Sequence, residues 1–340
     1  MKEHQYKIPT GAQIDSRLAG NSLPVSVQPQ SRMNRITCIP DLNPFISDES
    51  ECIQFLFDEG FLHTQMRCRQ CNTLLNPKVY RNKKFPLFYC DRGHSKTTVS
   101  CTKGTWFENT KIPPAQILLI TICFAHKFSY SQTAVACTIG NHLVSENMIA
   151  DWFSYCREVC VLSMEHKYAN RGKIGGPNHI VQVDECKIGR RKYHRGRVVE
   201  GNWILGMIDI NTNEVRMAIC PNNRRDAQTL YDLISEHVEL TSTIHTDAWR
   251  GYNGLLAGGF ANHLAVNHSL HFVDPITHVH TNNIESRWRS LRHRLSRGGI
   301  RKDQLDSHIS EHLWHLDCKN RGADPFQDLM EDIKAVYPVH

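Results

Sequence analysis

Residues 179–184 read His-Ile-Val-Gln-Val-Asp, and residues 242–247 read Ser-Thr-Ile-His-Thr-Asp. Both are short runs rich in β-branched residues, which is typical of strands, and both end on an aspartate. A third acid, Glu285, lies in Asn282-Asn-Ile-Glu-Ser-Arg-Trp288 at the start of a basic helical stretch. Asp184, Asp247 and Glu285 can therefore converge at one edge of a mixed sheet. Such a trio of carboxylates can hold two Mg²⁺ ions and drive phosphoryl transfer on nucleic acid.

The elements around these runs have the order of an RNase H-like fold. We expect strands at 179–188, 203–210, 214–220, 243–246 and 270–273, and helices at 226–238, 284–295 and 303–317. In this fold the first and fourth strands are neighbours, which brings Asp184 and Asp247 together. The pattern predicts an α/β catalytic domain with a mixed sheet over residues 178–335.

The predicted helix near Glu285 presents two stripes. Its buried stripe is expected to hold Ile284, Trp288, Leu291 and Leu295. Glu285, Arg289 and Arg292 form the neighbouring stripe at spacings of four and three, so one face offers a carboxylate for metal and two guanidinium groups for phosphates. A surface ion pair between Glu285 and Arg289 is the alternative, although it leaves the two aspartates unexplained. Glu185 is excluded as a ligand because it points to the opposite face of the sheet from Asp184.

The charge distribution indicates a polyanionic partner. The net charge is +6, yet residues 187–197 contain six Lys and Arg, and residues 287–302 contain seven and no acid. Both basic segments flank candidate catalytic acids, which favours nucleic acid as the partner. The alternative is that both are solvated surface faces.

Cysteine and histidine spacing predicts a zinc ribbon in residues 48–112, after a short helix. Cys68-Arg-Gln-Cys71 is followed about twenty residues later by Cys90-Asp-Arg-Gly-His94. Thiolates and imidazole suit tetrahedral Zn²⁺, and residues 78–88 can form a hairpin between the two pairs. His94 is favoured as the fourth ligand over Cys101, which lies in a segment that alternates like a strand. The alternative is a set of unligated core residues.

The rest of the chain divides by composition. Residues 1–47 lack periodicity and are expected to be a flexible leader. Residues 113–170 contain helices at 115–128, 129–139 and 145–168, with a turn at Gly140 and Ser145 as an N-cap, and are predicted to be a helix-turn-helix region. An ordinary all-α core has the same pattern. The longest apolar stretch, residues 115–125, is too short to span a bilayer, so no membrane partner is expected. The thirteen cysteines are scattered and no secretory signal precedes them, which favours a reduced, intracellular chain.

Together, these motifs resemble the DDE transposases of the Merlin superfamily and related bacterial insertion sequences, over residues 50–335. The matching segments are Val183-Asp-Glu185, Lys192-Tyr-His-Arg-Gly-Arg197, Trp203-Ile-Leu-Gly206, His245-Thr-Asp-Ala-Trp-Arg-Gly-Tyr252 and His280-Thr-Asn-Asn-Ile-Glu-Ser-Arg-Trp288. The zinc ribbon and the Gly104-Thr-Trp-Phe107 segment after it also match. The chain departs from the family in two places, with Arg292 where Lys is common and with His94 in a ribbon that commonly uses Cys alone.

The resemblance implies cut-and-paste transposition of double-stranded DNA with Mg²⁺ or Mn²⁺. It implies that Asp184 bridges two ions, that Asp247 and Glu285 each complete one, and that Lys192, Arg195 and Arg197 hold the DNA backbone. Some bacterial relatives use Asn at the third acidic position, so Asn283 competes with Glu285. A homodimer or higher oligomer on transposon ends and target DNA is expected, in the nucleus if the host is eukaryotic.

Two other functions fit the sequence. One is a domesticated transposase that binds DNA without cutting it, although the intact acid trio disfavours this. The other is a zinc-ribbon nuclease or RNA-processing enzyme on the same fold. A helix-turn-helix ahead of the sheet favours a protein that finds its own DNA ends.

Overall fold

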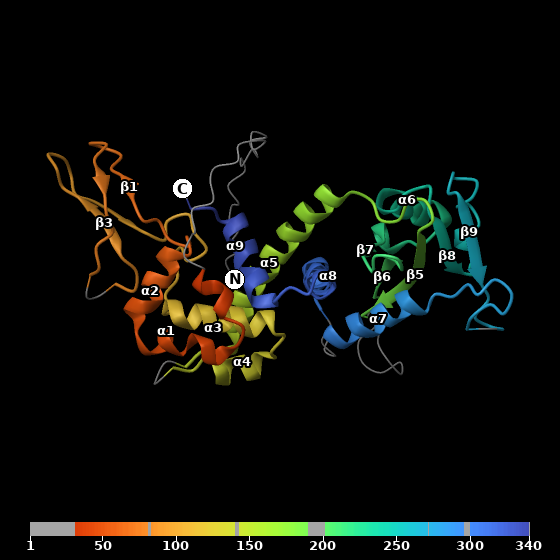
Figure 1. Cartoon of the computed structure of the whole chain (residues 1–340), viewed down its shortest axis with the longest axis horizontal. Coiled ribbons are helices and arrows are strands. Elements are labelled where there is room, and N and C mark those ends of the chain that lie inside the picture. The colour runs from red at the N-terminus through yellow and green to blue at the C-terminus, as the bar shows by residue number, and fades with distance from the viewer. Residues whose placement is uncertain are drawn as a thin grey trace. The chain divides into compact units, whose positions relative to one another are not determined.

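The structure is a computed structural model that describes residues 31–80, 83–139, 143–189, 201–270, 272–295 and 300–339. From Arg32 onward the chain forms one contact unit. Figure 1 shows the element order, in which small strands and helices precede the main sheet and further helices follow it. In the described residues no helix has the length and apolar character needed to cross a bilayer.

The predicted flexible leader is wrong for residues 32–47. Arg32–Arg35 and Ile39–Leu42 form 3₁₀ turns (η1 and η2), and Asn43–Ser47 forms α1. Met33, Leu42 and Phe45 are buried in the core, and Phe45 stacks on Phe55 with ring centroids 4.5 Å apart. Scattered apolar residues order this segment because they pack on α2 (Glu49–Asp58), the short helix predicted before the ribbon. Residues 1–30 lie outside the described residues.

Two antiparallel hairpins carry the cysteine and histidine pairs. Strands β1 (Met66–Arg67) and β2 (Leu74–Leu75) flank the first pair, and β3 (Leu87–Cys90) and β4 (Thr97–Ser100) flank the second. Each pair thus lies at a hairpin turn. The hairpin predicted for residues 78–88 has one antiparallel bridge, between Lys78 and Leu87, and its residues 81 and 82 lie outside the described residues.

A helical core follows the hairpins. Helix α3 (Pro114–Ala125) is buried along its whole length, as expected for an apolar core helix. The pair predicted as a helix-turn-helix is α4 (Tyr130–Ala136) and α5 (Glu146–Arg171), and the turn predicted at Gly140 lies outside the described residues. Ser145 caps α5 as predicted, since its Oγ accepts a hydrogen bond from the N–H of Met148 at 3.3 Å.

The last two helices, α8 (Leu305–Arg321) and α9 (Pro325–Val336), pack on α5. Lys167 of α5 lies 3.3 Å from the carboxylate of Asp332, and Arg171 lies 2.6 Å from that of Asp317. The sequence places both segments in the catalytic domain, and α9 is not among the helices that it predicts. Helix α8 packs on β7 of the main sheet as well as on α5, and its Trp314 is fully buried in the core.

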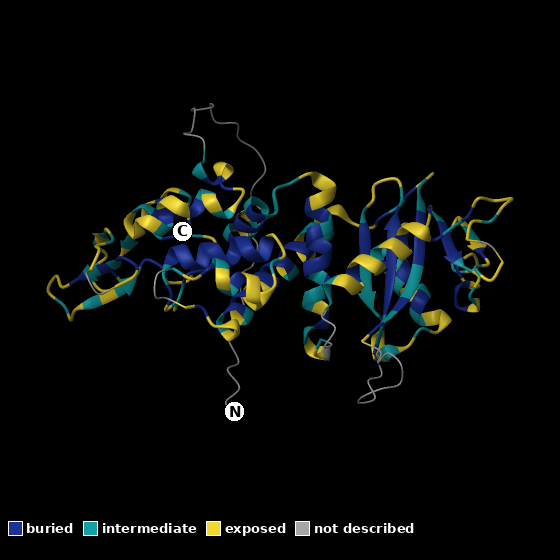
Figure 2. Cartoon of the chain, turned by 90° about the horizontal axis from the view of Figure 1, so that it is seen from below, coloured by how far each residue is buried: buried dark blue, intermediate teal, exposed yellow. Residues whose placement is uncertain are grey.

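The main sheet is mixed and has the strand order β7-β6-β5-β8-β9. Its strands are β5 (Ile180–Ile188), β6 (Asn202–Asp209), β7 (Val215–Ile219), β8 (Thr243–Asp247) and β9 (Asn262–Val266). The parallel pairing of β5 with β8 confirms that the first and fourth strands are neighbours. Helix α6 (Ala227–His237) contributes to the core on one face, and α7 (Asn282–Arg294) packs on the other. Figure 2 shows buried residues concentrated within these strands.

The prediction of a fifth strand at residues 270–273 is wrong. Leu270 and Phe272 are 71% and 80% exposed, and the edge position is taken by β9, which pairs in parallel with β8. Apolar composition alone does not make a strand, because the backbone must also find a pairing partner. Residue 271 lies outside the described residues.

Candidate functional site

Strand β5 and helix α7 run along each other with matched spacing. Alternate residues of β5 contact successive turns of α7. Gln182 contacts Asn283 and Ile284. Asp184 contacts Trp288, and Cys186 contacts Arg292. Two residues of a strand advance about 6.7 Å, and four residues of a helix advance about 6 Å. The alternate residues of β5 therefore meet every fourth residue of α7. Ile284 and Trp288 belong to the buried stripe predicted from the sequence, whereas Arg292 belongs to the neighbouring stripe.

Asp184 lies on the α7 face of the sheet. Its Oδ2 accepts a hydrogen bond of 2.9 Å from the indole N–H of Trp288. Burial raises the pKa of Asp184 to about 7, and the negative charges of Glu185 and Asp247 add to this rise. A carboxylate with these neighbours is relieved by a cation, which is the electrostatic condition for a metal site.

Asp247 ends β8 beside Asp184. The parallel ladder pairs Val181 with Ile244 and Gln182 with His245. Two residues further along each strand, the same register aligns Asp184 with Asp247 and points both side chains to the same face. Asp247 Oδ1 also accepts the backbone N–H of Trp249 at 3.0 Å, which orients the carboxylate at the strand end.

Glu285 lies in the first turn of α7, and its side chain is 48% exposed. Its Oε1 accepts the hydroxyl of Thr281 at 3.1 Å and lies 3.4 Å from His268 Nε2. An open pocket is lined by Asp184, Glu185, Glu285, Trp288, Arg289 and Arg292. Asn283, the competing candidate, is not one of the described residues that line this pocket. Its backbone N–H donates a hydrogen bond to Gln182 Oε1.

The basic residues predicted to hold DNA fall into two groups. Arg289 and Arg292 border the carboxylate pocket, and Arg292 Nη2 lies 2.8 Å from Cys186 Sγ. This contact holds one guanidinium group close to the sheet while it still faces the pocket. Lys192, Arg195 and Arg197 lie outside the described residues.

The side chain of Glu185 makes its hydrogen bonds away from α7. Its carboxylate accepts hydrogen bonds from the hydroxyl of Tyr252 and, at 3.3 Å, from Arg225. Arg225 lies 4.0 Å and 4.5 Å from the ring centroids of Trp203 and Trp249. The guanidinium group of Arg225 thus lies between two indole rings, and the backbone N–H of one of them, Trp249, donates a hydrogen bond to Asp247. Both contacts hold the strand end that carries Asp247 in place.

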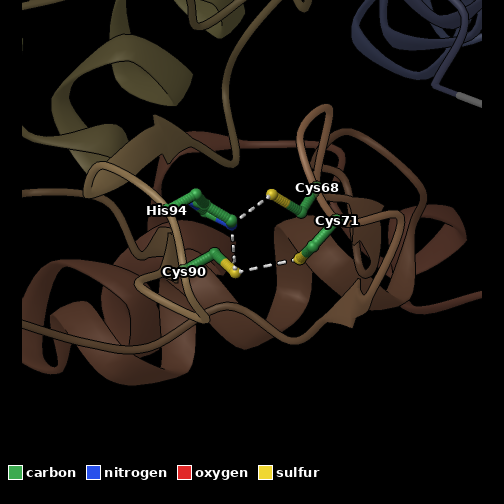
Figure 3. A group of neighbouring side chains, drawn as sticks. All are labelled: Cys68, Cys71, Cys90 and His94. Carbon is green, nitrogen blue, oxygen red and sulfur yellow. Dashed lines mark hydrogen bonds between the residues drawn. The ribbon is translucent and has the colours of Figure 1, made fainter.

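The two hairpins bring Cys68, Cys71, Cys90 and His94 together (Figure 3). Cys68 Sγ lies 3.4 Å from His94 Nε2, Cys90 Sγ lies 3.3 Å from the same nitrogen, and Cys71 Sγ lies 3.5 Å from Cys90 Sγ. A tetrahedral zinc site has ligand separations of roughly 3.5–3.8 Å. The cluster therefore has the size and the donor set of a zinc site.

The protonation of the cluster also suits a metal. His94 Nδ1 lies 2.7 Å from the carbonyl oxygen of Ser95, so Nδ1 carries the proton and Nε2 keeps its lone pair for the cluster. Hydrogen bonds from Thr73 are the main cause that lowers the pKa of Cys71 to about 6, which favours thiolate. Cys101, the competing ligand, is buried outside the cluster, and burial raises its pKa to about 12.

Two comparisons place the chain among known proteins. The family model described as an ISXO2-like transposase domain matches residues 174–317, which include all three acids. An uncharacterized transposase-like protein of Haemophilus influenzae is 30% identical over 104 residues, which span 30% of this chain and 80% of that relative. The chain belongs to the ISXO2-like transposase family. A structure titled "CryoEM structure of simian T-cell lymphotropic virus intasome in complex with PP2A regulatory subunit B56 gamma" is also similar, at 14% identity and a TM-score of 0.26. The match covers 58% of this chain and 64% of that chain's length, and a score this low carries no argument.

Sequence reasoning does not identify several residues of this carboxylate site. Gln182, Trp288, Arg225 and His268 each contact or support one of the acids. Trp288 belongs to the predicted buried stripe, and its indole N–H is also the donor to Asp184. The available signal was period two, because Gln182 precedes Asp184 by two residues and so shares its face.

Gly206 leaves room for the helix that carries Glu285. It pairs with Asp184 across the β5–β6 ladder, and a Cβ there would lie 2.5 Å from the Trp288 ring. We expect Gly206→Ala to destabilise the transposase by about 1–3 kcal/mol and to reduce DNA cleavage, because the Trp288 ring must move away from Asp184. Thermal melts and cleavage rates measure both effects. Gly254→Ala is the matched control, since nothing lies within 4 Å of its Cβ position, and equal losses in both variants would contradict the steric explanation.

The raised pKa of Asp184 predicts a pH-dependent stability in the metal-free protein. The folded state holds a proton that the unfolded chain releases above its ordinary pKa of 3.8, so stability should fall as the pH rises from about 4 through about 7. Asp184→Asn removes this loss, and we expect the variant to be more stable than wild type by about 2–4 kcal/mol at pH 8 in EDTA. Urea unfolding at pH 5 and pH 8 measures this difference. A constant difference between the two proteins at both pH values would show that Asp184 does not titrate there.

Proposed function

We propose that the chain is a DNA transposase that cleaves transposon ends and joins them to target DNA by metal-dependent phosphoryl transfer. The observation that carries this proposal is the position of Asp184, which is in register with Asp247 on the next strand and shares a pocket with Glu285. Asp184 lies in the middle of β5, Asp247 ends the neighbouring parallel strand β8, and Glu285 lines the same pocket as Asp184, which Arg289 and Arg292 border. Membership of a transposase family supports the same chemistry.

The residues of the site divide the work. Asp184, Asp247 and Glu285 would hold divalent Mg²⁺ or Mn²⁺, because hard oxygen ligands suit these ions. When bound, the ions supply Lewis acidity for phosphoryl transfer and lower the pKa of an attacking water or 3′-hydroxyl. Arg289 and Arg292 would hold the phosphates beside the acids, and Lys192, Arg195 and Arg197 would extend the contact along the DNA backbone. Trp288 and Arg225 would keep the aspartates oriented.

The segments before the sheet would recognise the DNA ends. Cys68, Cys71, Cys90 and His94 would bind Zn²⁺ and fix the two hairpins as a zinc ribbon. Helices α4 and α5 would act as a helix-turn-helix, with the exposed residues Ser145, Glu146 and Asn147 at the start of α5 available to bases. The full-length protein with Glu146→Ala and Asn147→Ala is expected to lose the preference of the wild type for terminal-repeat DNA over random DNA, and an unchanged preference would contradict this role.

The finer identity is part of the proposal. The motifs favour the Merlin superfamily, with an RNase H-like catalytic sheet and a homodimer or higher oligomer on DNA. Nuclear residence follows if the host is eukaryotic. A domesticated derivative that binds DNA without cutting is the second candidate, and a nuclease on the same fold is the third.

One assay separates these functions. The purified protein is incubated with Mg²⁺ and a labelled DNA taken from either flank of its own coding sequence, and a supercoiled plasmid is added as target. Cleavage at the flank followed by covalent joining to the plasmid supports a transposase. Cleavage without joining supports a nuclease, and specific binding without cleavage supports a domesticated derivative.

A further inference from the structure

The side chain of Gln182 connects β5 to the first turn of α7. The residue is fully buried, and its Oε1 accepts the backbone N–H of Asn283 at 3.0 Å and of Ile284 at 3.3 Å. Its Nε2 lies 3.2 Å from His280 Nδ1. Both ends of the amide are therefore engaged, and each partner lies about a hundred residues further along the chain.

These two N–H groups are the ones that an N-cap side chain ordinarily serves. Thr281 is the N-cap of α7, which makes Asn283 and Ile284 the second and third helical residues. Thr281 gives no side-chain cap to its own helix, and its hydroxyl donates instead to Glu285 Oε1 at 3.1 Å. The acceptor that α7 needs is thus supplied from β5, and the threonine is released to orient the acid.

We propose that Gln182 is a positioning residue that sets the distance between Glu285 and Asp184 by capping α7 from the sheet. The inference rests on the proposed metal-dependent function and identifies what assembles its site. Gln182 holds α7 at its first turn, and the Trp288–Asp184 hydrogen bond holds it further along. Glu285 lies between these two attachments, so its carboxylate is fixed relative to the strand that carries Asp184.

The neutral amide suits this place. A carboxylate here would accept the same two N–H groups, but it would add a negative charge two residues from Asp184, whose pKa burial already raises. A methionine has a similar volume and no oxygen, so it would leave the first turn of α7 without its acceptor. Gln182→Met and Gln182→Glu therefore separate the hydrogen bond from the volume.

The test measures Mn²⁺ binding to the full-length protein by electron paramagnetic resonance, which does not require activity. We expect Gln182→Met to weaken Mn²⁺ binding by about 10-fold or more, the range typical for the loss of a supporting contact behind a metal ligand. Gln182→Glu should stay within about 3-fold of wild type, because it retains the acceptor. The Mn²⁺ concentration for half-maximal DNA cleavage should shift in the same order, while DNA affinity stays unchanged.

The matched control is Ser242→Ala. Ser242 is a fully buried residue just before β8 whose Oγ accepts the backbone N–H of Gly176 at 2.9 Å, so its loss destabilises the same domain without touching α7. This variant should melt earlier and bind Mn²⁺ as wild type does. An equal loss of Mn²⁺ affinity in Gln182→Met and Ser242→Ala would reduce Gln182 to a stability role and overturn the proposal.

A second variant protects the test if Gln182→Met does not fold. His280→Ala removes the partner of Gln182 Nε2 at a half-buried position, and we expect a smaller loss of Mn²⁺ affinity in the same direction. The inference is overturned if both variants fold and bind Mn²⁺ with wild-type affinity. If Gln182→Met does not fold, wild-type Mn²⁺ affinity in His280→Ala alone overturns it. Normal Mn²⁺ binding by a wild type that cleaves no DNA would instead contradict the proposed function.

Discussion

Asp184→Asn and Asp247→Asn are each expected to lower the rate of DNA cleavage by about a thousandfold or more, with DNA affinity unchanged or slightly higher. A thousandfold loss corresponds to about 4 kcal/mol of transition-state stabilisation, a plausible scale for an incomplete metal site. Binding survives because Lys and Arg supply the affinity for phosphate, and each substitution removes a negative charge near it. Single-turnover cleavage of flank DNA, beside a binding titration, measures both quantities.

The control variants test whether the loss of cleavage depends on the place of the acid in the site or only on the loss of a negative charge. Glu239→Gln removes an exposed acid from the loop before β8 and should leave cleavage unchanged. Arg292→Ala should weaken binding and cleavage together, because its guanidinium group borders the pocket. Near-normal cleavage by either aspartate variant would end the two-metal proposal. Near-normal cleavage by Glu285→Gln alone would transfer the third role to Asn283 or another neighbour.

Loss of the zinc cluster is expected to have the second large effect. Cys71→Ser combined with Cys90→Ser should reduce the bound zinc from one ion per chain to none and abolish specific binding to DNA ends. The two hairpins have short strands, and structural zinc supplies about 10–16 kcal/mol of apparent binding free energy in small zinc-finger peptides. Without the ion we expect the hairpins to lose their order while the helical core and main sheet remain folded.

Metal analysis and hydrogen exchange of the purified variants measure this effect. His94→Ala should also empty the site, because Nε2 is the fourth donor. Cys101→Ser should keep its zinc, since that thiol is buried outside the cluster. Zinc retained in His94→Ala and lost in Cys101→Ser would reverse the ligand assignment and leave the ribbon itself intact.

Local pattern was sufficient for the elements that carry the acids. The β-branched runs ending at Asp184 and Asp247 became β5 and β8, and the spacing of Ile284, Trp288 and Leu291 became the buried face of α7. These predictions succeeded because the period of apolar residues is a local property. Asp247 ends its strand, whereas β5 continues past Asp184 to Ile188. Residues 32–47 and 270–273 failed for a non-local reason, since packing on α2 orders the first and pairing of β9 with β8 displaces the second.

The residues that hold the acids in position could not be predicted from the sequence. Gln182 meets Asn283, Arg225 meets Glu185 and Trp249, and α8 packs on α5, each across a long stretch of chain. A single polar residue within an apolar strand does not reveal its partner, because the partner depends on which helix covers that face. Pairing of β5 with β8 could be expected from fold order, whereas the capping of α7 from the sheet could not.

Cleavage of a plasmid that carries the coding sequence with its natural flanks tests the central claim most directly. We expect the wild-type protein with Mg²⁺ to break the DNA at both flanks, and we expect EDTA, Asp184→Asn and Asp247→Asn each to remove those breaks while the protein stays bound. Breaks that persist in EDTA or in either variant would contradict a metal site built from Asp184, Asp247 and Glu285.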